Sequence, residues 1–113
     1  MNKRAYVKGV KNMKKESVLK PEIEEKVSEL FKVLSDQTRI KILYALKESE
    51  LTVSEIVERV GISQSAISHQ LKTLRDIDLV TFRKEGKNVI YRLSDNHVYN
   101  IFNQAIEHVM EDN

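Results

Sequence analysis

The sequence predicts a mainly α-helical fold with one β-hairpin, arranged as a winged helix-turn-helix. Three observations support this prediction. Apolar residues recur at three- and four-residue steps in segments between residues 21 and 77, which is the period of amphipathic helices. A short turn from Gly61 to Ser63 joins two of these segments, as in a helix-turn-helix. After Ile77 the apolar period changes to about two around a glycine-containing loop, which indicates a hairpin.

The first helix is expected to begin at Pro21, because proline suits the first turn of a helix. Its apolar residues fall on one stripe, with Glu and Lys on the opposite side. The stripe consists of Ile23, Val27, Leu30, Phe31 and Leu34. A second helix can be capped by Ser35 or Asp36. Its apolar residues are Ile40, Ile42, Leu43 and Leu46.

A third, short helix is expected after Thr52, with Gly61 at its end. The following segment, from Gly61 to Val80, is predicted to hold the central helix of the domain, and Ser63 can cap it. Apolar residues at helical spacing mark its buried side. These residues are Ile67, Leu71, Leu74 and Ile77. The exposed start of this helix carries short hydrogen-bonding side chains that suit a DNA groove.

The hairpin is expected to have a basic tip at residues 83–88. Arg83, Lys84 and Lys87 outnumber the acidic Glu85 there. A last helix is expected to run to about residue 111 after a cap at Ser94 or Asp95. Its apolar stripe consists of Val98, Ile101, Phe102, Ala105 and Val109.

The composition is that of one soluble domain. The 113 residues are 41% hydrophobic and 32% charged, and no apolar run approaches membrane-spanning length. No apolar segment follows the basic N-terminus, so we expect no signal peptide. Because cysteine is absent, the chain can form neither a disulfide nor a thiolate metal site. We therefore expect a cytoplasmic protein.

Charge divides the chain after residue 20. Residues 1–20 contain seven basic residues and one acidic residue, a net charge of +6, whereas the remainder contains twelve basic and sixteen acidic residues, a net charge of −4. We expect residues 1–20 to form a basic, flexible arm and residues 21–113 to form the winged-helix domain. Such an arm suits a polyanionic partner, although a merely solvated tail has the same composition.

The central helix and the hairpin together predict a surface that binds double-stranded DNA. A helix can place its first residues against base edges in the major groove, where Gln64 can pair with adenine. The candidates for base or phosphate contacts in the helix are Ser63, Gln64, Ser65, Ser68 and His69. The candidates for phosphate contacts are Lys72, Arg83, Lys84 and Lys87. For His69, a role as a hydrogen-bonding scaffold residue is an equal alternative.

A second set of candidates follows the spacing D-x-H-x10-H-x-x-E in the last helix. It consists of Asp95, His97, His108 and Glu111. Around a regular helix, His108 and Glu111 lie within about 20° and 40° of His97. Along the axis, however, the two histidines are about 16 Å apart, whereas zinc holds its ligands at about 2 Å.

One ion can therefore join both ends of the set only if two copies of the helix pack antiparallel. Asp95 can take part only from a position at or before the N-cap. Two carboxylates and two imidazoles suit zinc, and cobalt as well. The simpler alternative is two solvated histidines and two acids at helix ends.

Three stretches resemble the ArsR/SmtB family of metal-responsive repressors. They are LSDQTRIKILYALKES (34–49), ISQSAISHQLKTLRDIDLV (62–80) and VIYRLSDNHV (89–98), and the resemblance covers about residues 23–111. It implies a winged-helix homodimer in which the first and last helices form the interface. The spacing in the last helix is similar to that of the zinc-sensing branch. Family sensors of cadmium, lead or arsenic use cysteines, which this chain lacks.

The resemblance implies a transcriptional repressor and not an enzyme. The metal-free dimer is expected to bind an inverted-repeat operator, and zinc is expected to lower its DNA affinity and derepress a zinc efflux or sequestration gene. We expect neither a membrane nor a small organic substrate as a partner. The alternatives are a repressor without metal response, a winged helix for protein contacts only, and a zinc hydrolase. Four protein ligands would leave no open coordination position for the last of these.

Overall fold

The computed structural model describes residues 17–111 of a chain that divides into two units, residues 1–31 and 32–113. Most of the predicted arm therefore lies outside the described residues. Helix α2 (Pro21–Leu34) begins at the predicted proline. None of its residues is buried, and Ile23, Val27 and Phe31 of its apolar stripe are exposed. Leu30 and Leu34 of the same stripe are half-buried.

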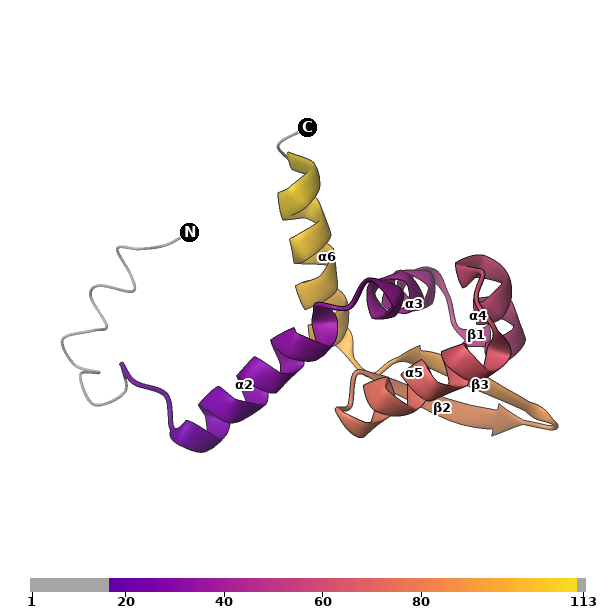
Figure 1. The fold of residues 1–113 in the computed structure, drawn as a ribbon, viewed down its shortest axis with the longest axis horizontal. Helices are drawn as coiled ribbons and strands as arrows, with labels where there is room; N and C mark the ends of the chain where they lie inside the picture. The colour runs from indigo at the N-terminus through magenta and orange to yellow at the C-terminus, as the bar shows by residue number, and fades with distance from the viewer. Residues whose placement is uncertain (1–16, 112–113) are drawn as a thin grey trace. The chain divides into compact units, whose positions relative to one another are not determined.

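The second unit contains four helices and three strands in the order of a winged helix-turn-helix, as predicted (Figure 1). They are α3 (Gln37–Glu48), β1 (Leu51–Thr52), α4 (Val53–Val60), α5 (Gln64–Asp76), β2 (Val80–Glu85), β3 (Asn88–Leu93) and α6 (Asn96–Glu111). The strands form an antiparallel sheet in the order β1-β3-β2. No helix within residues 17–111 is long and apolar enough to cross a membrane.

One hydrophobic core fixes α3, α4, α5 and the sheet relative to one another. Its fully buried side chains are Ile42, Leu43, Ile56, Ile67, Leu71, Leu74 and Val80. They come from three helices and one strand, so the helix that carries the predicted reading residues is held from several directions. In Figure 1 the hairpin of β2 and β3 extends past these helices as a wing.

Side-chain caps explain where α3 and α4 begin, and a glycine explains where α4 ends. Asp36, and not Ser35, caps α3 by accepting a hydrogen bond of 3.1 Å from a backbone N–H. Thr52 and Glu55 form a reciprocal capping box at the start of α4, with hydrogen bonds of 2.8 and 3.2 Å. Gly61 ends α4 with a φ of 83°, a left-handed conformation that glycine adopts without strain.

The sheet differs from the prediction in two ways. Strand β1 is not predicted, because two residues cannot show a period of two. Leu51 is nevertheless buried and pairs with Tyr91. The predicted six-residue tip is wrong, because residues 83–85 belong to β2 and the loop contains only Gly86 and Lys87. Since β2 is an edge strand, its charged residues are compatible with strand structure. Gly86 has a φ of 62°, which suits a two-residue hairpin loop.

Helix α5 ends in a Schellman motif that directs the chain into the wing. The N–H of Leu79 bonds to the carbonyl of Leu74 at 2.9 Å, and the N–H of Asp78 bonds to the carbonyl of Arg75 at 3.0 Å. Asp78 has a φ of 62°, the left-handed position that glycine usually occupies in this motif.

Replacing Asp78 with glycine is therefore expected to raise the free energy of unfolding by about 0.5–1 kcal/mol. The relieved left-handed strain of about 1–2 kcal/mol exceeds the entropic cost of glycine, about 0.5–1 kcal/mol. Urea denaturation of both proteins measures the difference. Asp78→Ala is the matched control, because it retains a β-carbon and should not stabilise. A less stable glycine variant would contradict this account of the motif.

Candidate functional site

The predicted reading residues at the start of α5 lie together on exposed surface. The exposed residues are Ser63, Gln64, Ser65, Ser68 and His69. The buried residues of α5 point into the core instead, so the polar face is available to a groove. Ser63 also caps the helix by accepting a hydrogen bond of 3.2 Å from the N–H of Ala66. Its hydroxyl proton can still be donated to a phosphate or a base.

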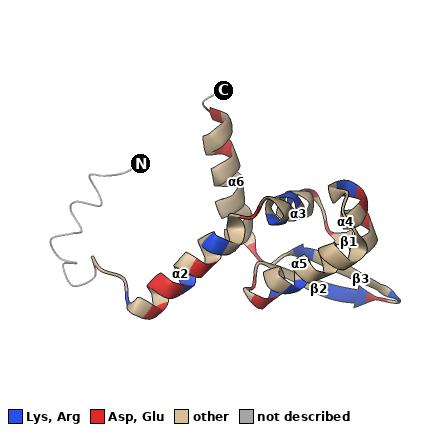
Figure 2. Cartoon of the chain, viewed as in Figure 1, with Lys and Arg blue, Asp and Glu red and all other residues tan. Residues whose placement is uncertain are grey.

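The candidate phosphate contacts fall into two groups. Arg83 forms ion pairs with Glu50 and Glu85, and these hydrogen bonds, that with Glu50 first, raise the pKa of its guanidinium. Lys72 pairs with an acid one turn along α5 at 3.2 Å. For Lys84 and Lys87, the described part of the chain provides no ion pair, and both are exposed. Figure 2 shows the basic residues along β2 and at the hairpin loop. Of the four candidate phosphate contacts, these two lysines are therefore the ones whose charge is not already paired within the described residues.

A contact that sequence spacing does not predict connects α5 to the wing. The guanidinium carbon of Arg75 lies 5.3 Å from the ring centroid of Phe82 on β2, within the range of a cation–π interaction. The ring of Phe82 lies in turn 5.4 Å from that of Tyr91 on β3. A basic residue in the last turn of a helix, followed by a strand with an aromatic residue, predicts such a contact only weakly. Sequence spacing alone does not show that the two side chains meet.

Asp95 and His97 form one end of the predicted metal-binding set. Asp95 directly precedes α6, and its Oδ1 accepts a hydrogen bond of 3.1 Å from the N–H of Val98. It therefore occupies the N-cap position that the prediction requires. This hydrogen bond, and then the nearby His97, lower the pKa of the Asp95 carboxyl, which is ionised at neutral pH.

The geometry of this pair fits two ligands of one ion. Oδ1 of Asp95 lies 3.7 Å from Nδ1 of His97, and both side chains are exposed. Two ligands about 2.0–2.1 Å from a tetrahedral ion stand about 3.3 Å apart. A small side-chain rotation would thus bring both atoms to ligand spacing, and both donors belong to the types that zinc accepts.

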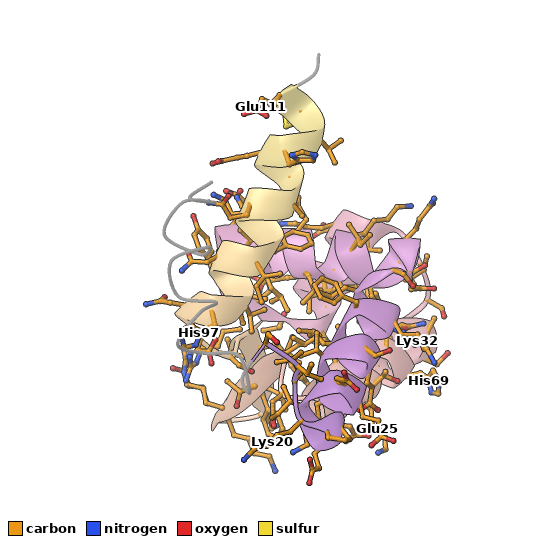
Figure 3. All side chains as sticks on the ribbon, turned by 90° about the vertical axis from the view of Figure 1, so that its left-hand side faces the viewer. Lys20, Glu25, Lys32, His69, His97 and Glu111 are labelled. Carbon is orange, nitrogen blue, oxygen red and sulfur yellow. The ribbon has the colours of Figure 1, made fainter. Side chains whose placement is uncertain are left out.

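His108 and Glu111 lie at the other end of α6 and are exposed. Figure 3 shows His97 and Glu111 at opposite ends of this helix. Within residues 17–111 of one chain, no three histidine or acidic side chains are close enough to hold a metal ion. A single chain therefore supplies two separate pairs of candidate ligands.

The apolar stripe predicted for α6 is divided between two environments. Val98 and Phe102 are buried in the chain's own core, whereas Val109 and Met110 are each 65% exposed. An open groove between α3, α4 and α6 is lined by apolar side chains. These include Ile40, Tyr44, Phe102, Ile106 and Met110. The second half of α6 thus presents apolar surface that the described part of the chain does not cover.

Comparison with known proteins adds to this geometry. The family model described as "Bacterial regulatory protein, arsR family" matches residues 36–81. Over 87 residues the chain is 39% identical to a "Transcriptional repressor SmtB homolog" from Synechocystis sp., covering 77% of this chain and 66% of that protein. Over 86 residues it is 41% identical to a "Cadmium resistance transcriptional regulatory protein CadC homolog" from Staphylococcus aureus, covering 75% and 71%.

A solved structure is also similar to this chain. It is the homodimeric winged helix-turn-helix DNA-binding domain of a possible ArsR-family transcriptional regulator from Mycobacterium bovis. The TM-score is 0.72 at 28% sequence identity, and the alignment covers 79% of this chain and 86% of that domain.

Proposed function

Because this chain belongs to the ArsR/SmtB family of bacterial regulators, we propose that it is a zinc-responsive transcriptional repressor. The metal-free homodimer binds an inverted-repeat operator, and zinc lowers its DNA affinity so that a zinc efflux or sequestration gene is derepressed. The observation that carries this proposal is the placement of one pair of candidate ligands at each end of α6. Since operator DNA lies in the cytoplasm of a bacterium, the protein acts there.

The fold and the class of protein have independent support. The named relatives are regulators of transcription, so the prediction that the chain is not an enzyme is confirmed. The exposed face of α5 and the lysines of the wing supply the two kinds of contact that a winged helix makes with DNA, base edges and phosphates. Operator sequence is read by the first turns of α5, where Gln64 is exposed.

A homodimer accounts for the apolar surface that a single chain leaves uncovered. Ile23, Val27 and Phe31 of α2 are exposed, as are Val109 and Met110 near the end of α6. Antiparallel pairing of two α6 helices covers the second of these surfaces and brings His97 of each subunit to His108 of the other. The similar domain from Mycobacterium bovis is itself homodimeric, which supports this arrangement.

The donor set of the proposed site favours zinc. Asp95 and His97 of one subunit and His108 and Glu111 of the other would hold the ion, with two oxygen and two nitrogen donors. A bound zinc ion would join the two subunits through their last helices. Although one relative is named for cadmium resistance, this chain has no cysteine and so cannot supply the thiolate ligands that favour soft ions. If zinc weakens DNA binding, DNA must weaken zinc binding by the same factor.

A DNA titration with and without zinc tests the proposal. The probe is a labelled duplex that the wild-type protein selects from a randomised pool. Zinc is expected to raise the dissociation constant at least about tenfold, within the usual range of coupling between two sites. A His97→Ala/His108→Ala variant should bind the duplex equally with and without zinc. Glu107→Gln, an exposed position of α6 about 80° around the helix from His97 and outside the ligand set, is the matched control and should respond as the wild type does.

The same titration separates the second candidate function. Zinc that binds the wild-type protein at α6 without changing its DNA affinity would indicate a repressor that does not respond to metal. DNA binding that does not weaken with salt would instead contradict a DNA-reading role altogether.

A further inference from the structure

Arg39 connects the helix that reads DNA to the end of a helix that forms the proposed dimer. It lies in the first turn of α3. Its Nε donates a hydrogen bond of 2.7 Å to Oε1 of Gln70 on α5, and one of its terminal nitrogens donates a longer one, 3.5 Å, to the carbonyl of Val33 in the last turn of α2. One side chain therefore bridges three helices.

The bridge is held in a fixed position at its base. The backbone N–H of Arg39 bonds to the capping carboxylate of Asp36 at 3.1 Å, so the start of the side chain moves with the cap of α3. The guanidinium is a planar fork, which transmits orientation better than a flexible ammonium. Both Arg39 and Gln70 are half-buried, so their 2.7 Å hydrogen bond is partly shielded from competing water.

The hydrogen-bond partners of Arg39 indicate that its side chain holds helices in position and does not neutralise a charge. Among the described residues, no carboxylate forms an ion pair with its guanidinium. Its side-chain acceptors are an amide oxygen and a backbone carbonyl, both neutral. Gln70 follows the exposed Ser68 and His69 directly in α5. A rotation of α5 about its axis would therefore stretch this bond and turn the reading face at the same time.

We propose that Arg39 is a positioning residue that fixes the orientation of α5 relative to the end of α2, and so sets the distance between the two reading helices of the dimer. This inference rests on the proposed function, because only a dimer on an inverted repeat has two reading helices. Such a dimer must match half-sites about one helical turn apart, or a multiple of it, so the orientation of each α5 decides which half-site spacing fits.

Operators of different half-site spacing test this role. The probe is the duplex that the wild-type protein selects, together with versions that have one base pair inserted or deleted at its centre. Arg39→Met keeps the apolar stem and removes the donors. It is expected to bind the selected duplex about tenfold more weakly, the usual loss for a hydrogen bond to a charged group. Its preference for that duplex over the altered spacings should fall by a similar factor.

Two further variants identify the bond as the cause. Gln70→Met should reproduce both effects, and the double variant should lose no more than either single variant. Lys41→Met, at an exposed position of the same helix, removes one positive charge and should keep the spacing preference. Circular dichroism and the melting temperature establish that each variant is folded before DNA is added.

The outcomes are distinct. A folded Arg39→Met protein that keeps the wild-type spacing preference would overturn the proposal, even if it bound every duplex more weakly. Full recovery of the preference in Arg39→Lys would also overturn it, because that variant keeps the charge but not the fork. If the wild-type protein bound its duplex with the same affinity with and without zinc, the proposed metal response would be wrong. The test of Arg39 would be unaffected, because it does not use zinc.

Discussion

A mixed dimer is expected to bind one zinc ion at the last helices when one subunit carries Asp95→Asn/His97→Ala and the other carries His108→Ala/Glu111→Gln. Each mutant homodimer is expected to bind none there. In the mixed dimer, one site receives all four native ligands and the other receives none. Asparagine retains the N-cap acceptor at residue 95, so the start of α6 is preserved. Because changes outside the ligand set alone cost about 10–100-fold in metal affinity, loss of two ligands should exceed about 100-fold.

Two affinity tags allow the mixed dimer to be purified, and calorimetry measures the number of zinc ions bound. Cobalt provides a second measurement, since its absorption spectrum reports tetrahedral coordination. If both homodimers kept full zinc affinity, the ligands would lie elsewhere in the chain. If the mixed dimer bound no zinc, the four residues would not form one shared site.

Neutralising Lys84 and Lys87, which form no ion pair with any residue from 17 to 111, is expected to weaken DNA binding on the order of 100-fold at moderate salt. Lys84→Gln/Lys87→Gln removes two cations from each subunit and four from the dimer. Each lost phosphate contact lowers the dependence of log affinity on log salt by about 0.9, so the slope should fall by about 3.6. Titrations of one duplex at several salt concentrations measure both quantities.

Arg83→Gln is the informative comparison within the same strand. The guanidinium of Arg83 is already paired with Glu50 and Glu85, so its loss should change the slope by much less. A slope that falls equally in both variants would mean that these ion pairs open when DNA binds. An unchanged slope in the lysine variant would contradict phosphate contacts by the wing.

Local signals made much of this fold predictable. Pro21, Thr52, Gly61 and Ser63 each mark a helix end through their own backbone or side-chain chemistry, and the structure places helix boundaries at all four. Apolar spacing likewise identified Ile67, Leu71 and Leu74 as buried residues of α5, whereas Ile77, predicted on the same side, lies just past the end of the helix and is half-buried. The N-cap position of Asp95 could be predicted for the same reason, because a cap depends only on the few residues that follow it.

Features that depend on residues distant in sequence could not be predicted in this way. The pairing of Leu51 with Tyr91 joins segments forty residues apart. The contact of Arg75 with Phe82 depends on how the wing folds back toward α5. For the last helix, spacing shows a single apolar stripe, but only the structure shows that Phe102 is buried within the chain while Val109 is exposed.

The two sides of α5 also bear on how such a regulator diverges. Ile67 and Leu71 anchor the helix in the core, whereas Gln64, at the start of the helix, and Ser68 are exposed. Substitutions at exposed positions of this kind usually change stability by no more than about 0.5 kcal/mol. After gene duplication, a few substitutions on the exposed surface of α5 can therefore give one copy of the regulator a new target DNA sequence. That copy still responds to the same signal as before. Target choice and signal choice can thus evolve independently within one small domain.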